Sequence, residues 1–97
     1  MKQYVIIARD GSDEAALERR MAVRHLHLAG ASVLKAQGQF VVGGATLSSE
    51  GHMNGSVMIV QFETNEAFDA WYRQEPYIVN GVWQHVEVLP FKVAPVE

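Results

Sequence analysis

The chain has 97 residues, of which 48% are hydrophobic, and it contains no cysteine. This length supports one packed core without covalent cross-links and leaves no room for a second, so we expect a single domain over residues 1–97. The absence of cysteine excludes disulfides, thiolate catalysis and thiolate metal sites. The net charge of −3, with the basic residues scattered, argues against nucleic acid as a partner.

Membrane and export signals are also absent from the pattern. No stretch approaches the roughly 18 apolar residues of a membrane span, and the short apolar run near Met1 is too brief for a secretory signal. We therefore expect a cytoplasmic protein with no membrane partner.

The first third of the chain predicts a strand followed by a long helix. Residues 4–8, Tyr-Val-Ile-Ile-Ala, are rich in β-branched side chains and lead into a polar turn. Ser12 or Asp13 is a suitable cap for a helix that continues to about Gln37. Gly38 follows as a C-terminal stop.

The middle of the chain predicts two strands joined by a loop. Residues 40–42 form the second strand, which runs into Gly43 and Gly44. Residues 47–55 are loop by composition, because they are rich in Gly, Ser and Asn. Residues 56–62 form the third strand.

The last third predicts a second helix and a fourth strand. Thr64 or Asn65 caps a helix over 66–74, and Pro76 ends it. Residues 83–91 form the last strand. The order βαββαβ is that of a ferredoxin-like α+β fold with a four-stranded antiparallel sheet.

The pattern of the strands favours a homodimer. Both helices of this fold lie on one face of the sheet, so an apolar second face would be exposed in a monomer. A second copy that packs sheet against sheet would cover it; the alternative is a monomer with an unusually apolar outer face. The strands place apolar residues on both sides, with Val5 and Ile7 opposing Ile6 in the first, Val57 and Ile59 opposing Met58 in the third, and Val86 and Val88 opposing Trp83 and Leu89 in the fourth.

The long helix carries two polar residues within an apolar face. At 100° per residue, Arg24 falls near the middle of this face and His27 towards one edge. A buried arginine needs a partner, from the protein or from a ligand. His27 suits acid/base chemistry because it titrates near neutrality, although a core histidine bonded to a backbone carbonyl is the alternative. The apolar residues of the face are Leu17, Met21, Leu28, Ala31 and Leu34.

Glu75 is the third candidate site residue. It lies at the C-terminal end of the second helix, where a carboxylate opposes the helix dipole. Such a local conflict is typical of functional groups, and a solvated surface side chain is the alternative.

Glycines surround the predicted loop and supply further candidates. Gly44, Gly55 and the adjacent Ser56 can bring backbone N–H groups and a hydroxyl close to a ligand, and a mobile loop can act as a lid. The spacing matches no phosphate-binding motif. No cofactor motif is visible, and His25 and His27 point to different helix faces, so we expect no metal and no cofactor. The aromatic residues of the second helix, Phe68, Trp71 and Tyr72, are expected to make packing or dimer contacts.

Three stretches together resemble a known family. They are Arg24-His25-Leu26-His27-Leu28 followed by Gly38 and Gly43-Gly44; Gly55-Ser56-Val57; and Glu75-Pro76-Tyr77 followed by Gly81-Val82 and Pro90-Phe91-Lys92. In order and spacing they resemble the R-x-x-H-L helix motif, the G-S strand start and the D-P-Y/F and G-V motifs of the YciI-like (YCII-related) family. The resemblance covers nearly the whole chain.

The resemblance implies a dimeric α+β barrel with a site in a cleft between helix and sheet. Carried onto this sequence, the site is centred on His27 and Glu75, with Arg24 and Ser56 as binding groups. Enzymatic members imply lyase or dehalogenase-type chemistry on small ring compounds, and the wider superfamily adds isomerases and cofactor-free monooxygenases. Glu75 stands where the family usually has Asp, and His25 where relatives often have proline, which implies a changed pair geometry and a straighter helix.

Two functional hypotheses follow. In the first, His27 is a general acid or base that Glu75 orients, and Arg24 holds a small anionic or phenolic substrate. In the second, the same cleft binds or senses a small molecule without turnover. A third reading, a dimerisation module that serves a partner protein, predicts no ligand in the cleft.

Overall fold

The computed structural model describes residues 1–97. Its elements follow the predicted order βαββαβ, with one added short helix before the last strand. The strands pair antiparallel in the order β2-β3-β1-β4, which confirms the ferredoxin-like α+β class. The strands are β1 (Lys2–Asp10), β2 (Phe40–Leu47), β3 (Met53–Phe62) and β4 (Trp83–Phe91), and the helices are α1 (Ala16–Ala36), α2 (Asn65–Gln74) and α3 (Pro76–Val79).

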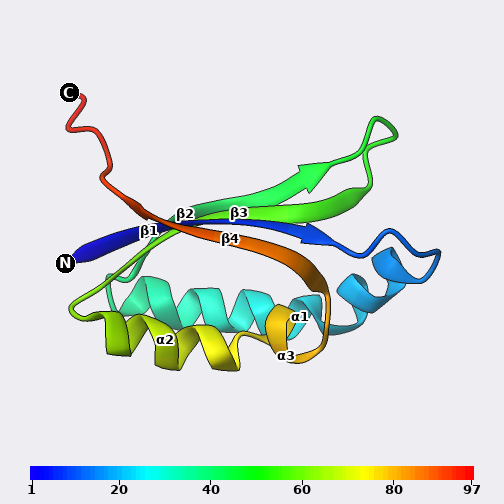
Figure 1. Ribbon diagram of the computed structural model, residues 1–97, viewed down its shortest axis with the longest axis horizontal. Coiled ribbons are helices and arrows are strands. Elements are labelled where there is room, and N and C mark those ends of the chain that lie inside the picture. The colour runs from blue at the N-terminus through cyan, green and yellow to red at the C-terminus, as the bar shows by residue number, and fades with distance from the viewer.

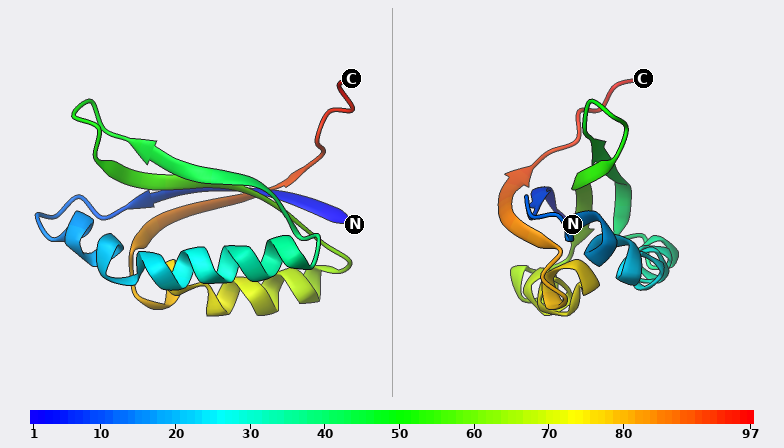
Figure 2. Two further views of the ribbon diagram at one scale, coloured as in Figure 1. Left: turned by 180° about the vertical axis from the view of Figure 1, so that it is seen from behind. Right: turned by 90° about the vertical axis from the view of Figure 1, so that its right-hand side faces the viewer.

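The helices cover one face of the sheet and leave the other bare (Figures 1 and 2). The core lies between the helices and the sheet, where Ile6, Met58 and Val60 are almost completely buried. Alternate residues of the same strands point away from the helices. On that outer face Ile7 is 36% exposed and Val57 37% exposed. No helix of the chain has the length and apolarity that crossing a membrane would demand.

The two long helices begin differently from each other. Thr64 caps α2 as predicted, because its side chain accepts a hydrogen bond from the Ala67 N–H at 3.1 Å. The prediction that Ser12 or Asp13 caps the first helix is wrong: α1 begins at Ala16 without a side-chain cap. Asp13 instead pairs with Arg19, at 2.8 Å.

The glycine-rich segment is a β-hairpin with a short loop. β2 continues through Gly43 and Gly44, which pair with Met58 and Val57 of β3. Only residues 48–52 lie outside the strands, so the predicted nine-residue loop, and the lid built on it, is wrong. Composition misled the prediction because glycine is uncommon in strands and common in loops.

A bulge reverses the predicted facing of Trp83. Asp10 pairs with Trp83 and Arg9 with His85, so Gln84 is an extra residue in β4. Trp83 is therefore buried on the helix side of the sheet with Val86, and does not oppose it as the sequence suggested.

The buried face of α1 differs from the apolar face that the sequence predicts. Arg20 and Leu34 are the buried residues of the helix, and Val23 packs against the core. Leu17 and Met21 are instead 36% and 49% exposed. The helix is rotated so that Arg20 and His27 face the core, because both have carboxylate partners there.

Candidate functional site

The functional side chains of α1 lie on one side of the helix. Arg20 and His27 are two turns apart, and both face away from solvent towards β1, β3 and α3. Each meets a carboxylate, Arg20 that of Asp10 at the end of the preceding strand and His27 that of Glu75 in a distant part of the chain. α1 is continuous through residues 22–26, so no break changes the phase between them.

His27 and Glu75 form a close, shielded pair. Nδ1 of His27 lies 2.6 Å from Oε1 of Glu75, and the two side chains are 12% and 2% exposed. Glu75 stands where an aspartate was expected, and its longer side chain still contacts the imidazole. The other ring nitrogen, Nε2, makes no hydrogen bond within the chain and is not fully buried.

Glu75 owes its position to the junction of two helices. It ends α2 and caps α3, where its Oε1 accepts the Tyr77 N–H at 3.0 Å and Pro76 occupies the first helical position. Glu75 thus lies at the C-terminal end of α2 as expected, and the predicted conflict with the helix dipole is offset because the carboxylate also caps α3 by accepting the Tyr77 N–H.

Tyr77 fixes the plane of the imidazole. Its ring stacks on His27 with the centroids 4.0 Å apart and an interplanar angle of 12°. The Arg20 guanidinium lies 4.7 Å from the centre of the same ring. Burial raises the pKa of the Tyr77 hydroxyl, and the positive charges of Arg20 and Arg24 act in the opposite direction. The hydroxyl is fully buried without a hydrogen-bond partner.

A second buried pair joins Arg20 to the end of β1. Its Nη1 lies 3.1 Å from both carboxylate oxygens of Asp10, with side chains 3% and 2% exposed. Its Nη2 donates to Ser56 Oγ at 2.9 Å, and the Trp83 indole N–H donates to the same oxygen at 3.1 Å. The Ser56 oxygen accepts both bonds within the protein, so Ser56 belongs to this network.

A small cleft opens beside His27, and we call it the His27 cleft. It has a volume of about 90 Å³. Arg24 lines it and has no acidic partner in the chain. Of the lining residues, Arg20 is paired with Asp10 and His27 with Glu75, so the positive character of the cleft comes from Arg24. Its lining residues are Arg20, Arg24, His27, Leu28, Ala31, Phe40, Gly43, Gly44, Ala45 and Met58.

The structure separates the predicted binding residues into two groups. Arg24 and Gly44 line the His27 cleft, as a binding role requires. Ser56 and Gly55 do not. Gly55 lies in a paired part of β3, where an added Cβ would come within 2.5 Å of the Ala8 carbonyl oxygen, so close strand packing explains this glycine.

Sequence reasoning missed Arg20, Asp10, Tyr77 and Trp83. The spacing of Arg20 and His27 was the available signal, because residues seven apart share a helix face. No group of three or more histidine, aspartate or glutamate side chains converges on a point that could hold a metal ion.

Fold and site together define a ferredoxin-like α+β protein with a buried histidine–carboxylate pair beside a positively charged cleft. The family model of the YCII-related domain matches residues 2–92, and the chain belongs to this family. Protein YciI of Escherichia coli is 38% identical over 95 residues, which cover 92% of this chain and 95% of that protein.

Two solved structures share the fold. The 5-chloro-2-hydroxyhydroquinone dehydrochlorinase TftG of Burkholderia phenoliruptrix, in complex with 2,5-dihydroxybenzoquinone, has a TM-score of 0.82 at 25% identity, with 95% of each chain covered. A dimeric ferredoxin-like protein of unknown function from Jannaschia has a TM-score of 0.59 at 16% identity, with 96% of this chain and 100% of that chain covered.

Proposed function

We propose that the protein is a cofactor-independent enzyme that uses His27 and Glu75 for acid/base chemistry on a small anionic or phenolic compound. The observation that carries this proposal is the 2.6 Å contact between His27 Nδ1 and Glu75 Oε1, with Nε2 left unbonded within the chain. A carboxylate on one ring nitrogen fixes the tautomer and increases the basicity of the other. Proton transfer by such a group contributes about 10²–10⁴-fold to a rate.

The surroundings of the pair suit a negatively charged ligand. Arg24 supplies a cation without an internal partner, and a guanidinium binds carboxylate, phenolate or enolate oxygens through paired N–H groups. The cleft of about 90 Å³ is smaller than a cavity of about 150 Å³ that holds benzene. A ring would therefore enter only in part, with its acidic edge towards His27 and Arg24.

The likeness to TftG favours an elimination of the dehalogenase type. In such a step His27 accepts a proton from the substrate, and chloride departs with the bonding electron pair, so the ring loses HCl. This step needs no external oxidant or reductant. Arg24 holds the negative charge that develops on a ring oxygen, and Glu75 stabilises the imidazolium that forms.

Chloride release tests the proposal directly. Incubated with 5-chloro-2-hydroxyhydroquinone, the wild-type protein is expected to release chloride, measured by ion chromatography. His27→Ala should reduce the rate about 10²–10⁴-fold. His27→Gln is the matched variant that keeps a polar side chain, and circular dichroism would show that both variants stay folded. A folded His27→Ala protein with the full wild-type rate would refute the role of this residue.

A non-catalytic role is the alternative, and the small size of the His27 cleft favours it. In that case 2,5-dihydroxybenzoquinone binds, Arg24→Gln weakens its binding, and no chlorinated quinol is turned over. Calorimetry with this quinone shows whether the cleft binds a ligand, and the chloride assay then separates the two functions. Absence of both turnover and binding would show that the His27 cleft is not a site for these compounds.

We further propose that the protein is a homodimer joined through the outer face of the sheet. None of the helices α1, α2 and α3 covers this face, and an apolar surface of this kind is rarely left exposed to solvent. The dimeric Jannaschia protein of the same fold supports this. The residues of the face include Val5, Ile7, Val42, Val57, Ile59 and Leu89.

Light scattering after gel filtration tests the dimer. The wild-type protein should elute with twice the mass of the chain, and Val57→Lys, in the centre of the face, should yield the monomer. Glu87→Lys, which alters the charge of the same face in β4 without removing an apolar side chain, is the control. A wild-type protein with the mass of one chain at micromolar concentration would contradict the proposal.

A further inference from the structure

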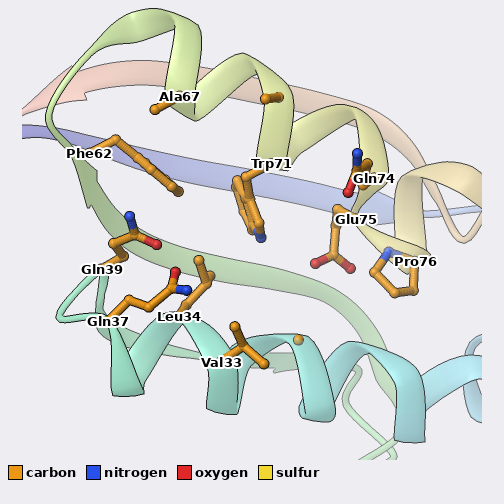
Figure 3. A pocket seen from close by; sticks show the side chains of 12 residues that line it. Val33, Leu34, Gln37, Gln39, Phe62, Ala67, Trp71, Gln74, Glu75 and Pro76 are labelled. Atoms are coloured by element: carbon orange, nitrogen blue, oxygen red, sulfur yellow. The ribbon is translucent and has the colours of Figure 1, made fainter.

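A second and larger hollow lies between the two long helices (Figure 3). We call it the α1–α2 groove; its volume is about 580 Å³. It shares no lining residue with the His27 cleft. Glu75 nevertheless connects the two, since it lines the groove and bonds His27. The groove is lined by Gly30, Val33, Leu34, Gln37, Gln39, Phe62, Ala67, Ala70, Trp71, Gln74, Glu75 and Pro76.

The groove and the cleft have opposite electrostatic character. Glu75 is the only charged residue that lines the α1–α2 groove, whose other polar residues are glutamines. In the His27 cleft, Arg24 is a cation without an acidic partner, whereas Arg20 and His27 are paired with Asp10 and Glu75. A ligand of the groove should therefore be a cation or a hydrogen-bond donor, whereas the cleft suits anions.

The carboxylate of Glu75 has an unused oxygen. Both of its hydrogen bonds, from His27 and from the Tyr77 N–H, involve Oε1. Oε2 has no partner, although the residue is only 2% exposed, and it is not among the atoms sealed from solvent. Figure 3 shows the carboxylate directed into the groove. Because Oε2 is open to the groove and has no donor within the chain, it can accept a hydrogen bond from a ligand there.

Trp71 provides an aromatic wall for the same ligand. Its side chain projects from α2 into the groove, on the side of Glu75 (Figure 3). Its indole N–H makes no hydrogen bond within the chain. The faces of tryptophan attract cations within about 6 Å more strongly than other aromatic rings do.

Gly30 keeps the groove open on the α1 side. A glycine in the interior of a helix is destabilising relative to alanine. An added Cβ at Gly30 would meet no atom within 4 Å, so packing does not explain the glycine. Gly30 therefore marks a position in the wall of the groove where only a side chain larger than a methyl group would take up its space.

We propose that the α1–α2 groove is a second ligand site, which takes a small aromatic amine in its protonated form. The ammonium group donates to Oε2 of Glu75, and the ring lies along Trp71 and Leu34. Because Glu75 is shared, the amine competes with His27 for the negative charge of the carboxylate. Binding in the groove is thus linked to the His27–Glu75 contact, and this link is reciprocal.

The two tryptophans allow a direct binding test by nuclear magnetic resonance. The protein has two indole N–H groups, one in the groove and one, from Trp83, bonded to Ser56, and Trp71→Phe assigns them. Titration with 2-phenylethylammonium should shift the Trp71 signal. 2-Phenylethanol, which lacks the charge, should bind about tenfold more weakly, and phenylacetate should leave the signal unchanged.

Variants on both sides of Glu75 sharpen the test. Gly30→Leu fills the groove with a good helix former and should weaken amine binding at least about tenfold, whereas Gly30→Ala should retain most of it. Glu75→Gln should also weaken it about tenfold. Arg24→Gln lies in the His27 cleft and is the matched control, which should leave the affinity for the amine unchanged.

The outcomes distinguish this site from the proposed reaction. No shift of Trp71 with the amine, an equal affinity for the alcohol or the acid, or full binding by Gly30→Leu would each overturn the groove site. None of these measurements depends on turnover. A wild-type protein that binds the amine but releases no chloride would retain the groove site and lose the reaction, and the reverse result would do the opposite.

Discussion

Two buried polar pairs lie on the same side of α1, and they differ in which atoms remain unused. Arg20 meets Asp10 through both carboxylate oxygens, and Ser56 accepts a further bond from its guanidinium. His27 and Glu75 meet through one atom each and leave Nε2 and Oε2 without partners. In the Arg20 pair the one unpartnered nitrogen, Arg20 Nε, is sealed from solvent, whereas the His27 pair has an unpartnered atom on each side that solvent can reach.

This difference separates a structural role from a functional one. Burial is similar in both pairs, so burial alone does not identify a site. What distinguishes the His27 pair is that its unpartnered atoms are not sealed from solvent and that the α1–α2 groove adjoins it, whereas the His27 cleft is lined by Arg20 as well as by His27. The comparison therefore predicts that changes in the first pair affect stability most, and changes in the second affect ligands most.

The largest effect on stability is expected from Asp10→Ala. It leaves the Arg20 guanidinium buried without its counter-ion, which should reduce the free energy of unfolding by about 3–5 kcal/mol. Urea unfolding followed by circular dichroism measures this. The double variant Asp10→Ala with Arg20→Met should recover much of the loss, because it removes the unpaired charge. A loss below about 1 kcal/mol in the single variant would remove the distinction between the pairs.

A smaller effect on stability is expected from Glu75→Gln. The amide oxygen can still accept the Tyr77 N–H, so the free energy of unfolding should fall by only about 1–2 kcal/mol. Urea unfolding followed by circular dichroism measures this change. If Glu75→Gln destabilises the fold as much as Asp10→Ala, the second pair is structural as well.

Tyr77 contacts both pairs, and its replacement by Phe should have a small effect with a defined pH dependence. The hydroxyl has no partner, so its removal should change stability at neutral pH by about 1 kcal/mol or less. Burial raises the Tyr77 pKa above its ordinary value of 10.0. The folded state therefore retains this proton when the unfolded state loses it, and stability falls as pH rises above about 10.

The alkaline limb of the stability curve measures the Tyr77 effect. Between about pH 9 and pH 11 the Tyr77→Phe variant should lose less stability than the wild type. Tyr4 and Tyr72, whose pKa values are also raised by burial, remain in both proteins and contribute a common slope. Identical alkaline limbs would contradict the assignment.

The smallest effect is expected at the exposed pair of Asp13 and Arg19. The hydrogen bond from Arg19 lowers the pKa of Asp13 below 3.8, so any stability from this pair is present above that pH and is lost as pH falls through the lower value. Arg19→Gln should move the Asp13 pKa back towards 3.8, as measured by NMR, without a detectable change in unfolding at neutral pH. A clear loss at neutral pH would be at odds with the exposure of the pair.

Much of the fold could be predicted because local signals agreed with one another. Thr64, Pro76 and the β-branched runs each marked an element at about the observed place. The glycines of β2 and the bulge at Gln84 were not predictable in the same way, since both depend on pairing with a neighbouring strand.

Only part of the site could be predicted from the sequence. His27 and Glu75 stood out through their residue types and through the family resemblance, but the position of Glu75 as a cap of α3 depends on a helix of four residues. Arg20 was missed because Leu17 and Met21 are apolar and were therefore assigned to the buried face of the helix, although both are exposed in the structure. Its partners, Asp10 at the end of the preceding strand and Ser56 within β3, depend on how α1 packs on the sheet and could not be inferred from spacing along the chain.

The two-turn separation of Arg20 and His27 limits how the chain can vary in length. Deleting one residue between them would rotate the rest of α1 by about 100° and detach one pair or the other. Insertions at 48–52 would lengthen a hairpin tip and leave both pairs in place. Evolutionary insertions and deletions in this lineage should therefore accumulate at the hairpin and be excluded from the middle of α1.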